Sequence, residues 1–361
     1  MAPTERIRLS DGAGGELMQR MLGKDVLPLL RSRGSVHGTE LTPEMLDDSA
    51  SIGDNAFTID GYTVWPLEFP GGDIGRIAVD GTVNDLAVVG AVPEALAVSY
   101  VLEEGLDIEL LRRISRSIGE ASAEAGVEIV TGDTKVVEKG GVRGMIVTSA
   151  GIGRRSPRLQ GNLEKAKGLR TDAGAPWTET RWIRDDLVRI GDRIILTGSV
   201  GDHGVAILSF REGYGFSTDI VSDVAPLNGL MDKAMCVGGL VAAKDLTRGG
   251  LANGLNEWSQ KSRCQILVDE KSIPVREPVR SATDLLGLDP YEIGNEGKAI
   301  IAVAPGIEEE VLEAIRKDRY GKDAVLIGTA IPGPPRVVLK TVVGGKRIMD
   351  PPHGDPIPRI C

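Results

Sequence analysis

The sequence predicts a mixed α/β (α+β) fold in two domains, on three observations. Apolar residues alternate between strand-like and helix-like spacing along most of the chain. The chain has 361 residues, more than the roughly 250–300 at which a single core usually stops growing. The alternation stops between residues 154 and 186, in a stretch of Arg, Pro, Gly and Lys too long for an ordinary loop. We therefore expect a first domain over residues 1–154, a linker or insertion over 155–184, a second domain over 185–338 and a flexible tail over 339–361.

The spacing of apolar residues places the elements of the first domain. Apolar residues recur at helical spacing from Ile108 to Ile118, behind Asp107, whose residue type caps helices. This pattern predicts a helix over 107–125. The other expected elements are helices over 16–22 and 73–90, and strands over 56–60, 94–102, 127–131 and 144–152.

The second domain repeats the alternation and then ends in a different kind of segment. The expected elements are strands over 193–197, 265–268, 298–303 and 324–327, and helices over 202–211, 251–259 and 308–317. Four prolines between residues 351 and 358 exclude a regular helix or a central strand there. We expect an extended tail that ends at the thiol of Cys361.

Composition excludes several classes of protein. The formal net charge is −10, which repels polyanions and argues against nucleic acid or an anionic membrane as a partner. No apolar run approaches the roughly 18–20 residues that cross a bilayer. The first residues lack a signal-peptide pattern, so we expect a cytoplasmic protein. The three Cys and three His are scattered, which argues against a disulfide framework or a structural zinc site.

Four short acidic segments carry the predicted chemistry. They lie at residues 47–50, 80–86, 132–135 and 245–250, while the common phosphate-binding and dinucleotide-binding motifs are absent. Any one such carboxylate is most often a solvated turn residue or a helix cap. Together they suggest oxygen ligands for Mg²⁺ that bridges to phosphate. Lys135 could neutralise a phosphate or transfer a proton.

Two glycine-rich loops and one cysteine add to this picture. The loops at residues 11–15 and 249–250 precede predicted helices and leave backbone N–H groups free for an anion. Chance would place one of three Cys at the last of 361 positions only about 1% of the time. An exposed thiol at Cys361 is therefore a candidate reactive group, the alternative being an incidental residue at a frayed end. Cys236 and Cys264 are expected to be buried structural residues.

The motifs, taken together, resemble a known family. They are DGAGGELMQRML, DDSA, DGTVNDLAVVGA, TGDTKVV, GDHG, DLTRGG, GNEGK and the final PRIC, in order along nearly the whole chain. This set resembles the HypE family of hydrogenase maturation factors, within the superfamily of aminoimidazole ribonucleotide (AIR) synthetase, PurM, and selenophosphate synthetase. The resemblance implies a two-domain PurM-like (AIR synthase-like) fold with an extended C-terminal tail. It also implies a homodimer in which the N-terminal sheet joins that of a partner, and ATP held by Mg²⁺ in the cleft.

The resemblance also implies roles for particular residues. The metal ligands would be Asp48, Asp85 and Asp245, and the catalytic residues Cys361, Lys135 and Glu296. The nucleotide-binding set would be Asp48, Thr82, Asn84, Asp85, Gly132, Asp133, Thr134, Lys135, Asp245 and Arg248. Glu296 is the expected proton acceptor and Lys135 the expected phosphate partner. An internal Lys–Glu ion pair without a chemical role is the alternative for these two.

The implied activity is the making of cyanide. The carbamoyltransferase HypF would load a carbamoyl group onto Cys361, ATP would drive its dehydration to a thiocyanate, and the cyano group would pass to iron on a HypC–HypD scaffold. One alternative is a thiol carrier without catalysis. Another is a different ATP-dependent enzyme of the superfamily, such as a selenophosphate synthetase. That enzyme would need a reactive Cys or selenocysteine near residues 11–15, where there is none.

Overall fold

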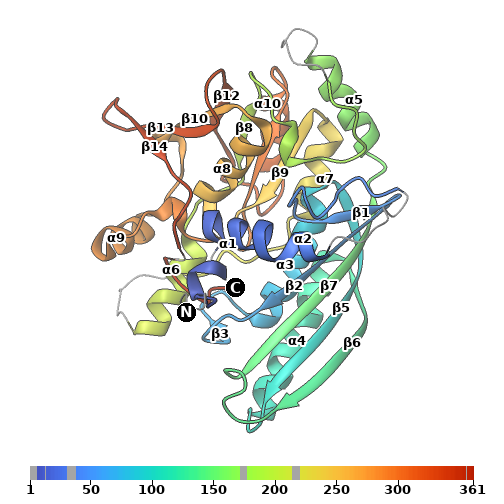
Figure 1. Cartoon of the computed structure of the whole chain (residues 1–361), viewed down its shortest axis with the longest axis vertical. Helices are drawn as coiled ribbons and strands as arrows, with labels where there is room; N and C mark the ends of the chain where they lie inside the picture. Colours follow the sequence, from blue (N-terminus) through green and yellow to red (C-terminus); the bar gives the residue numbers. More distant parts are fainter. Residues whose placement is uncertain (1–5, 13, 31–37, 171–176, 214–219, 355) are drawn as a thin grey trace, which may run out of the picture.

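The chain folds into two α/β units, each built on its own sheet (Figure 1). The computed structural model describes residues 6–361 except 13, 31–37, 171–176, 214–219 and 355. Ala13 in the predicted glycine-rich loop over 11–15, His37 (one of the three His) and parts of the predicted linker and tail therefore lie outside the described residues. The predicted mixed α/β fold is confirmed.

A five-stranded sheet of order β1-β2-β7-β5-β6 forms the N-terminal unit. Helices α3 and α4 cover one face of it and pack against each other. A two-stranded ribbon, β3–β4, leads into α3. The elements are α1 (Gly15–Met21), α2 (Leu27–Leu30), β1 (Ala50–Ile52), β2 (Asn55–Tyr62), β3 (Glu68–Phe69), β4 (Gly72–Asp73), α3 (Ile74–Val88), β5 (Ala91–Glu103), α4 (Ile108–Ala125), β6 (Glu128–Val137) and β7 (Met145–Arg155).

The C-terminal unit has a seven-stranded sheet of order β14-β13-β10-β12-β8-β11-β9. Short 3₁₀ turns lie in this unit at Asp185–Leu187, Glu270–Ser272 and Pro290–Glu292. In the N-terminal part of the chain, a 3₁₀ turn at Leu9–Gly12 precedes α1 and a π-helical turn at Leu22–Val26 follows it. The elements are α5 (Leu159–Leu169), β8 (Arg193–Leu196), α6 (Asp202–Glu212), α7 (Asn228–Val237), β9 (Leu240–Asp245), α8 (Gly250–Ser262), β10 (Gln265–Asp269), α9 (Glu277–Leu286), β11 (Ala299–Val303), α10 (Glu308–Arg316), β12 (Val325–Ile331), β13 (Arg336–Lys340) and β14 (Lys346–Met349).

Helices cover both faces of the seven-stranded sheet. Every residue of β11 is buried, because Ile301 packs in the cluster with α7 and α10 while Ile300 packs in the cluster with α8. A strand buried on both faces is a continuous apolar run, which is why 298–303 was predictable. The five-stranded sheet differs, because its strands alternate buried and exposed side chains and leave one face open.

Two segments differ from the sequence prediction. The predicted linker contains helix α5, whose residues Leu159 and Leu163 are buried, and Trp182 farther along is also fully buried. Trp182 packs in the cluster that contains α7, so this part of the linker belongs to the core. The predicted tail begins later than residue 339, because β14 pairs antiparallel with β13. Sequence analysis also missed β9, α7 and α9.

Asn84 on α3 joins the two units. Its side-chain amide donates to the carbonyl of Ala225 at 3.1 Å, and its Oδ1 accepts the Leu227 N–H at 2.7 Å. The amide also lies 3.4 Å from the carbonyl of Glu296. All these groups are buried, so Asn84 satisfies backbone polar atoms that water does not reach.

Replacing Asn84 should therefore lower stability. Asn84→Ala leaves a buried N–H and a buried carbonyl unpaired, and we expect the free energy of unfolding to fall by about 1–3 kcal/mol. Urea denaturation of the variant and the wild type measures this. Asn228→Ala is a matched control, because its side chain donates to one helix-end carbonyl, that of Ala125, in a partly buried setting. An unchanged midpoint for Asn84→Ala would contradict the bridging role.

Candidate active site

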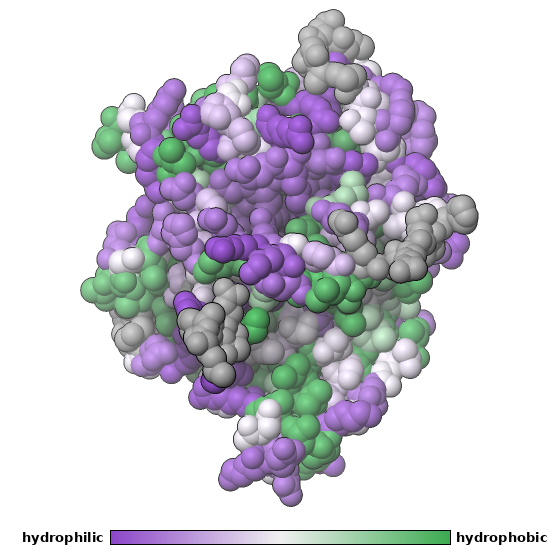
Figure 2. All heavy atoms as spheres, viewed as in Figure 1, coloured by the Kyte–Doolittle hydropathy of each residue, from purple (hydrophilic) through white to green (hydrophobic). Residues whose placement is uncertain are grey.

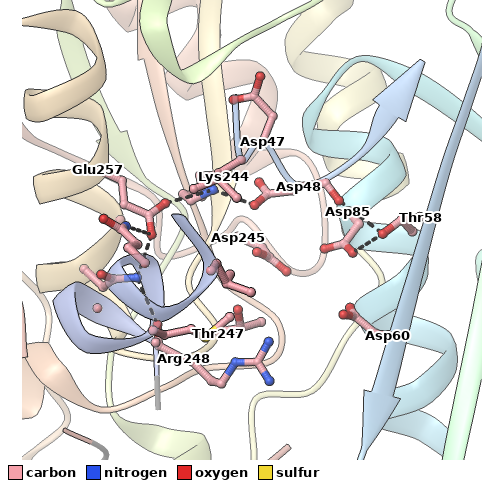
Figure 3. A pocket seen from close by; sticks show the side chains of 18 of the residues that line it. Asp47, Asp48, Thr58, Asp60, Asp85, Lys244, Asp245, Thr247, Arg248 and Glu257 are labelled. Carbon is pink, nitrogen blue, oxygen red and sulfur yellow. Dashed lines mark hydrogen bonds and ion pairs between the residues drawn. The ribbon is translucent and has the colours of Figure 1, made fainter. Parts of the chain in front are cut away.

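A cavity of about 270 Å³ lies between the two units. Strand β2 and helix α3 border it on one side, β9 and the start of α8 on the other, and α1 contributes a further wall (Figure 3). Its lining residues include Gly14, Gly15, Met18, Asp47, Asp48, Thr58, Asp60, Asp85, Lys244, Asp245, Thr247, Arg248, Gly250, Asn253 and Glu257.

The three predicted metal ligands all line this cavity. Asp245 ends β9, Asp85 lies on α3 and Asp48 precedes β1, so the fold brings them together from both units. The Oδ2 atom of Asp245 is buried without a hydrogen-bond partner, whereas Asp85 Oδ2 accepts from Thr58 Oγ1 at 2.8 Å. Burial, and then neighbouring carboxylates, raise the pKa of both Asp85 and Asp245 well above the ordinary value. This site is short of positive charge.

A buried lysine compensates one of the three carboxylates. Lys244 Nζ lies 2.5 Å from Asp48 Oδ1, 3.2 Å from Asp185 and 3.3 Å from Glu257. Burial still raises the pKa of Asp48 to about 6. The pKa of Asp185 falls to about 2, because Lys244 and Lys261 outweigh the effect of its burial. Lys244 thus holds the inner end of the cavity together as an internal cation.

The remaining carboxylates fit a divalent cation only with further ligands. Within the described part of the chain, no three His, Cys, Asp or Glu residues are arranged to hold a metal ion alone. The orphaned oxygen of Asp245 and the excess of buried acids nevertheless suit a hard cation, which prefers oxygen ligands. Phosphate oxygens and water would have to complete its shell.

Both predicted glycine loops border the cavity. Helix α1 starts at Gly15 and helix α8 at Gly250, each behind a glycine with positive φ, 80° at Gly14 and 79° at Gly249. A Cβ at Gly15 would lie 2.5 Å from the Pro352 carbonyl oxygen, and a Cβ at Gly249 would lie 3.0 Å from the Pro352 ring. The loops therefore need glycine to let the tail pass between them.

A second, smaller cavity adjoins the first and contains Cys361. It shares Asp60, Asp85, Asp245, Thr247 and Arg248 with the larger cavity and adds Gly61, Tyr62, Gly81, Glu296 and Cys361. Glu296 is buried, and its Oε2 has no hydrogen-bond partner. Burial, and then Asp245 and Asp223, raise its pKa well above the ordinary value. The charge of Cys361 is the largest cause that raises the pKa of Arg248. Two of the three predicted catalytic residues, Cys361 and Glu296, thus lie together beside the acidic cavity.

The tail is seated in the cleft. The Thr63 N–H donates to the carbonyl of Cys361 at 3.1 Å, and the Trp65 N–H donates to that of Arg359 at 3.1 Å. The side chains of Ile357 and Ile360 are buried. Backbone hydrogen bonds and two buried isoleucines thus hold the last residues of the predicted tail in the cleft.

Six predicted site residues do not line either cavity. Thr82 is fully buried under the sheet, where its hydroxyl donates to Ala78 O and contacts Ser149, and the side chain of Asn84 is used in the bridge described above. The other four, Gly132, Asp133, Thr134 and Lys135, lie on the exposed edge strand β6. Lys135 Nζ pairs with Asp133 Oδ2 at 3.1 Å, and both side chains are more than half exposed. Neither lies at the cleft of its own chain.

Among the charged residues of the site, sequence analysis did not single out Asp60, Lys244 or Glu257. Asp60 on β2 faces Asp245 and Arg248 across the cavity, and Lys244 and Glu257 form the internal ion pair (Figure 3). Lys244 was detectable, since it directly follows the apolar run from Leu240 to Ala243 and precedes Asp245. Glu257 and Asp60 carried no such signal, because acidic residues are ordinary on a helix or at a strand end.

This combination of two α/β units and an acidic interdomain cleft defines the class of the protein. Residues 46–154 match the N-terminal domain of AIR synthase related proteins, and residues 189–340 match the C-terminal domain of that family. The chain is thus an AIR synthase related protein in both halves.

Within that class the similarity is closer still. The chain is 42% identical over 359 residues to the carbamoyl dehydratase HypE of Rhizobium leguminosarum bv. viciae, covering 99% of this chain and 95% of the relative. It matches a crystal structure of the hydrogenase maturation protein HypE in complex with ATP, with a TM-score of 0.77, 36% identity and coverage of 99% and 100%. It also matches HypE in a HypE–HypF complex, with a TM-score of 0.77, 40% identity and coverage of 86% and 94%. The chain belongs to the HypE family. In the part of the chain that the structure describes, no helix is both long and apolar enough to span a membrane.

Proposed function

We propose that this chain uses ATP to dehydrate a carbamoyl group on the Cys361 thiol to a thiocyanate. This reaction makes the cyanide ligand of the [NiFe]-hydrogenase iron. The main support for this proposal is that the two cavities have lining residues in common. Cys361 and Glu296 line the smaller one, and Asp85, Asp245 and Arg248 line both. A group held on the thiol would therefore lie next to a phosphate held in the larger cavity.

The chemistry requires this adjacency. The oxygen of an S-carboxamide is a very poor leaving group, so it must first take the γ-phosphoryl group of ATP, releasing ADP. The phosphorylated oxygen then leaves as phosphate while the nitrogen loses its protons and the C≡N bond forms. Glu296 accepts one of the two protons of that nitrogen, and the departing phosphate takes the other. Burial makes ionised Glu296 a stronger base than an exposed glutamate, and Arg248 opposes the protonation that burial favours.

Asp48, Asp85 and Asp245 are the residues that would hold Mg²⁺ between protein and phosphate. The cation would neutralise charge on the phosphate groups as the phosphoryl group transfers. Asp245 offers its orphaned oxygen directly, and Asp85 has one oxygen not used by Thr58. The helix starts at Gly15 and Gly250 line the same cavity, and a helix N-terminus favours an anion.

A second copy of the chain would complete the site through β6. This edge strand has its N–H and C=O groups free on one side, and nearly all its side chains are exposed. Its Val130 and Val136 are 61% and 68% exposed, and the open sheet face adds Phe57, Ile59 and Ile152. Figure 2 shows hydrophobic residues gathered over this part of the molecule. A homodimer that pairs these edges would cover them, and Asp133 and Lys135 would then reach a cleft of the assembly. Lys135 keeps its proposed role as phosphate partner there.

Two further partners follow from the proposed reaction. The carbamoyl group would come from HypF, as the related HypE–HypF complex suggests, and the cyano group would leave to iron on HypC–HypD. A selenophosphate synthetase is disfavoured, since the only described cysteine that lines either cavity is Cys361. A carrier without catalysis would have no use for the acidic cavity.

The reaction predicts a defined sequence of masses. With HypF, carbamoyl phosphate, ATP and Mg²⁺, the terminal peptide of the wild type should gain a carbamoyl group and then lose one water. Cys361→Ala should gain nothing, and Glu296→Gln should accumulate the carbamoyl form. Cys236→Ala is the matched control: the expectation that Cys236 is buried is wrong, because its side chain is exposed on α7, whereas Cys264 is buried as expected. Modification mapped to Cys236 or Cys264 would contradict the assignment.

The metal role predicts a loss of ATP hydrolysis. Asp245→Asn removes one of the three carboxylates proposed to hold the cation. We therefore expect ATPase activity to fall at least about tenfold with the fold intact. EDTA should abolish the activity of the wild type. Asp232→Asn, at a half-exposed ion pair with Arg158 on the surface, is the control. Full activity of Asp245→Asn, or activity in EDTA, would refute the metal site.

The dimer predicts a dependence on β6. Val136→Glu places a charge in the paired edge, and sedimentation velocity should show the dimer of the wild type weakened at least about tenfold. Val343→Glu is the control, since Val343 is 90% exposed in the turn between β13 and β14. A wild type that sediments as a monomer with full activity would overturn the proposal.

A further inference from the structure

His203 is a buried residue that the proposed mechanism does not use. It is the second residue of α6 and is fully buried. Its Nε2 lies 2.7 Å from the carbonyl oxygen of Ile360, and its Nδ1 lies 2.7 Å from Ser222 Oγ. A carbonyl only accepts, so Nε2 carries the hydrogen and Nδ1 accepts from the Ser222 hydroxyl. Ser222 Oγ in turn accepts the Val224 N–H at 3.1 Å. The hydrogen bonds all run in one direction, toward the residue before Cys361.

The same residue of the tail is held by its side chain. The Cδ1 atom of Ile360 would lie 2.9 Å from a Cβ at Gly294 and 3.4 Å from a Cβ at Gly204. The Cδ1 of Ile357 would lie 3.3 Å from the Cβ at Gly204. A side chain at Gly294 would thus clash with Ile360, and both isoleucines pack closely against Gly204. Ile360 is thus fixed by its carbonyl on His203 and by its side chain between two glycines.

The segment that orients His203 also orients Glu296. Asp223, next to Ser222, accepts the backbone N–H of Glu296 on its Oδ1 at 3.0 Å. The Ser222 N–H donates to the carbonyl of Pro70 in the N-terminal unit at 2.8 Å. Two adjacent residues therefore set the place of the tail and the place of the proton acceptor, and tie both to the other unit.

We propose that His203 is a positioning residue for Cys361, which acts through the carbonyl of Ile360 to place the loaded thiol beside Glu296. The proposal rests on the proposed function, because it assigns His203 to the dehydration step and not to loading by HypF. The lowered pKa of His203, which its burial causes, is consistent with the neutral ring that this hydrogen bonding needs.

We call the contacts that hold the end of the tail, from His203 and from Gly204 and Gly294, the seat. The first test measures how well the seat protects Cys361, and it needs no carbamoyl donor. Full-length protein is treated with iodoacetamide, and alkylation of Cys361 is followed by peptide mass, with exposed Cys236 as the internal reference. His203→Leu should speed alkylation of Cys361 at least about tenfold, since a buried hydrogen bond that holds the tail is lost. His203→Gln, which can offer an N–H near the position of Nε2, should restore most of the slow rate. His353→Leu, at an exposed position of the same tail, is the matched control and should change nothing.

The second test separates loading from dehydration. In a single turnover with HypF, carbamoyl phosphate and ATP, His203→Leu should gain the carbamoyl group at the normal rate but lose water at least about tenfold more slowly. ATP affinity and the thermal midpoint are measured on the same samples. Ser222→Ala, which removes the partner of Nδ1, should shift both readouts in the same direction, and it serves if His203→Leu does not fold. Alkylation at the wild-type rate in the folded variants, or equal slowing of loading and dehydration, would overturn the role of His203. A wild type that alkylates slowly but never dehydrates would overturn the proposed function and leave the seat intact.

Discussion

The burial of negative charge is the constraint on which the rest of this structure depends. Asp48, Asp85, Asp245 and Glu296 face two adjoining cavities with little access to water. Ionised carboxylates in such a place are costly unless cations compensate them, and the chain supplies Lys244 at one end and Arg248 at the other. Between these two cations, the carboxylates of Asp85 and Asp245 remain without a compensating positive charge. Buried carboxylates without enough cations repel a free phosphate, which is why the proposed function places a cation between them and the phosphate.

The architecture of the two units was largely predictable because it rests on local pattern. Apolar residues at helical spacing predicted the helix over 107–125, and a continuous apolar run predicted the buried strand over 298–303. Helix α4 and strand β11 lie at these places. Asp107 caps α4 through the Glu109 N–H, as its residue type indicated. Helix α5 and strand β9 were missed for different reasons. Only a few apolar residues of α5 face the core, and β9 is an apolar run too short to tell from a helix segment.

The site was predictable only in part, because the three-dimensional arrangement of the elements decides which residues of each motif reach the cavity. Acidic motifs at Asp48, Asp85 and Asp245 converge because Asp48 precedes strand β1, Asp85 lies on helix α3 and Asp245 ends strand β9, and the fold brings these places together. Thr82 and Asn84 share a motif with Asp85, yet successive residues of a helix point in different directions, and these two face the sheet and the other unit. Lys135 lies on an edge strand, so its distance from the cleft could be learned only from the arrangement of strands. The seat at His203 joins residues more than 150 positions apart, which no local pattern records.

The seat of the tail has a consequence for the rate at which the thiol of Cys361 can move between this site and a partner protein. The last residues are tethered to β14, and a tether of about ten residues keeps its end at an effective concentration on the order of millimolar near the seat. A seat of only micromolar intrinsic affinity would then be occupied nearly all the time. The hydrogen bonds and the two isoleucines that hold Cys361 can therefore be few and weak, and the end can still detach quickly. A delivery arm built this way combines high occupancy with fast exchange, which a freely diffusing carrier could match only by binding more tightly and leaving more slowly.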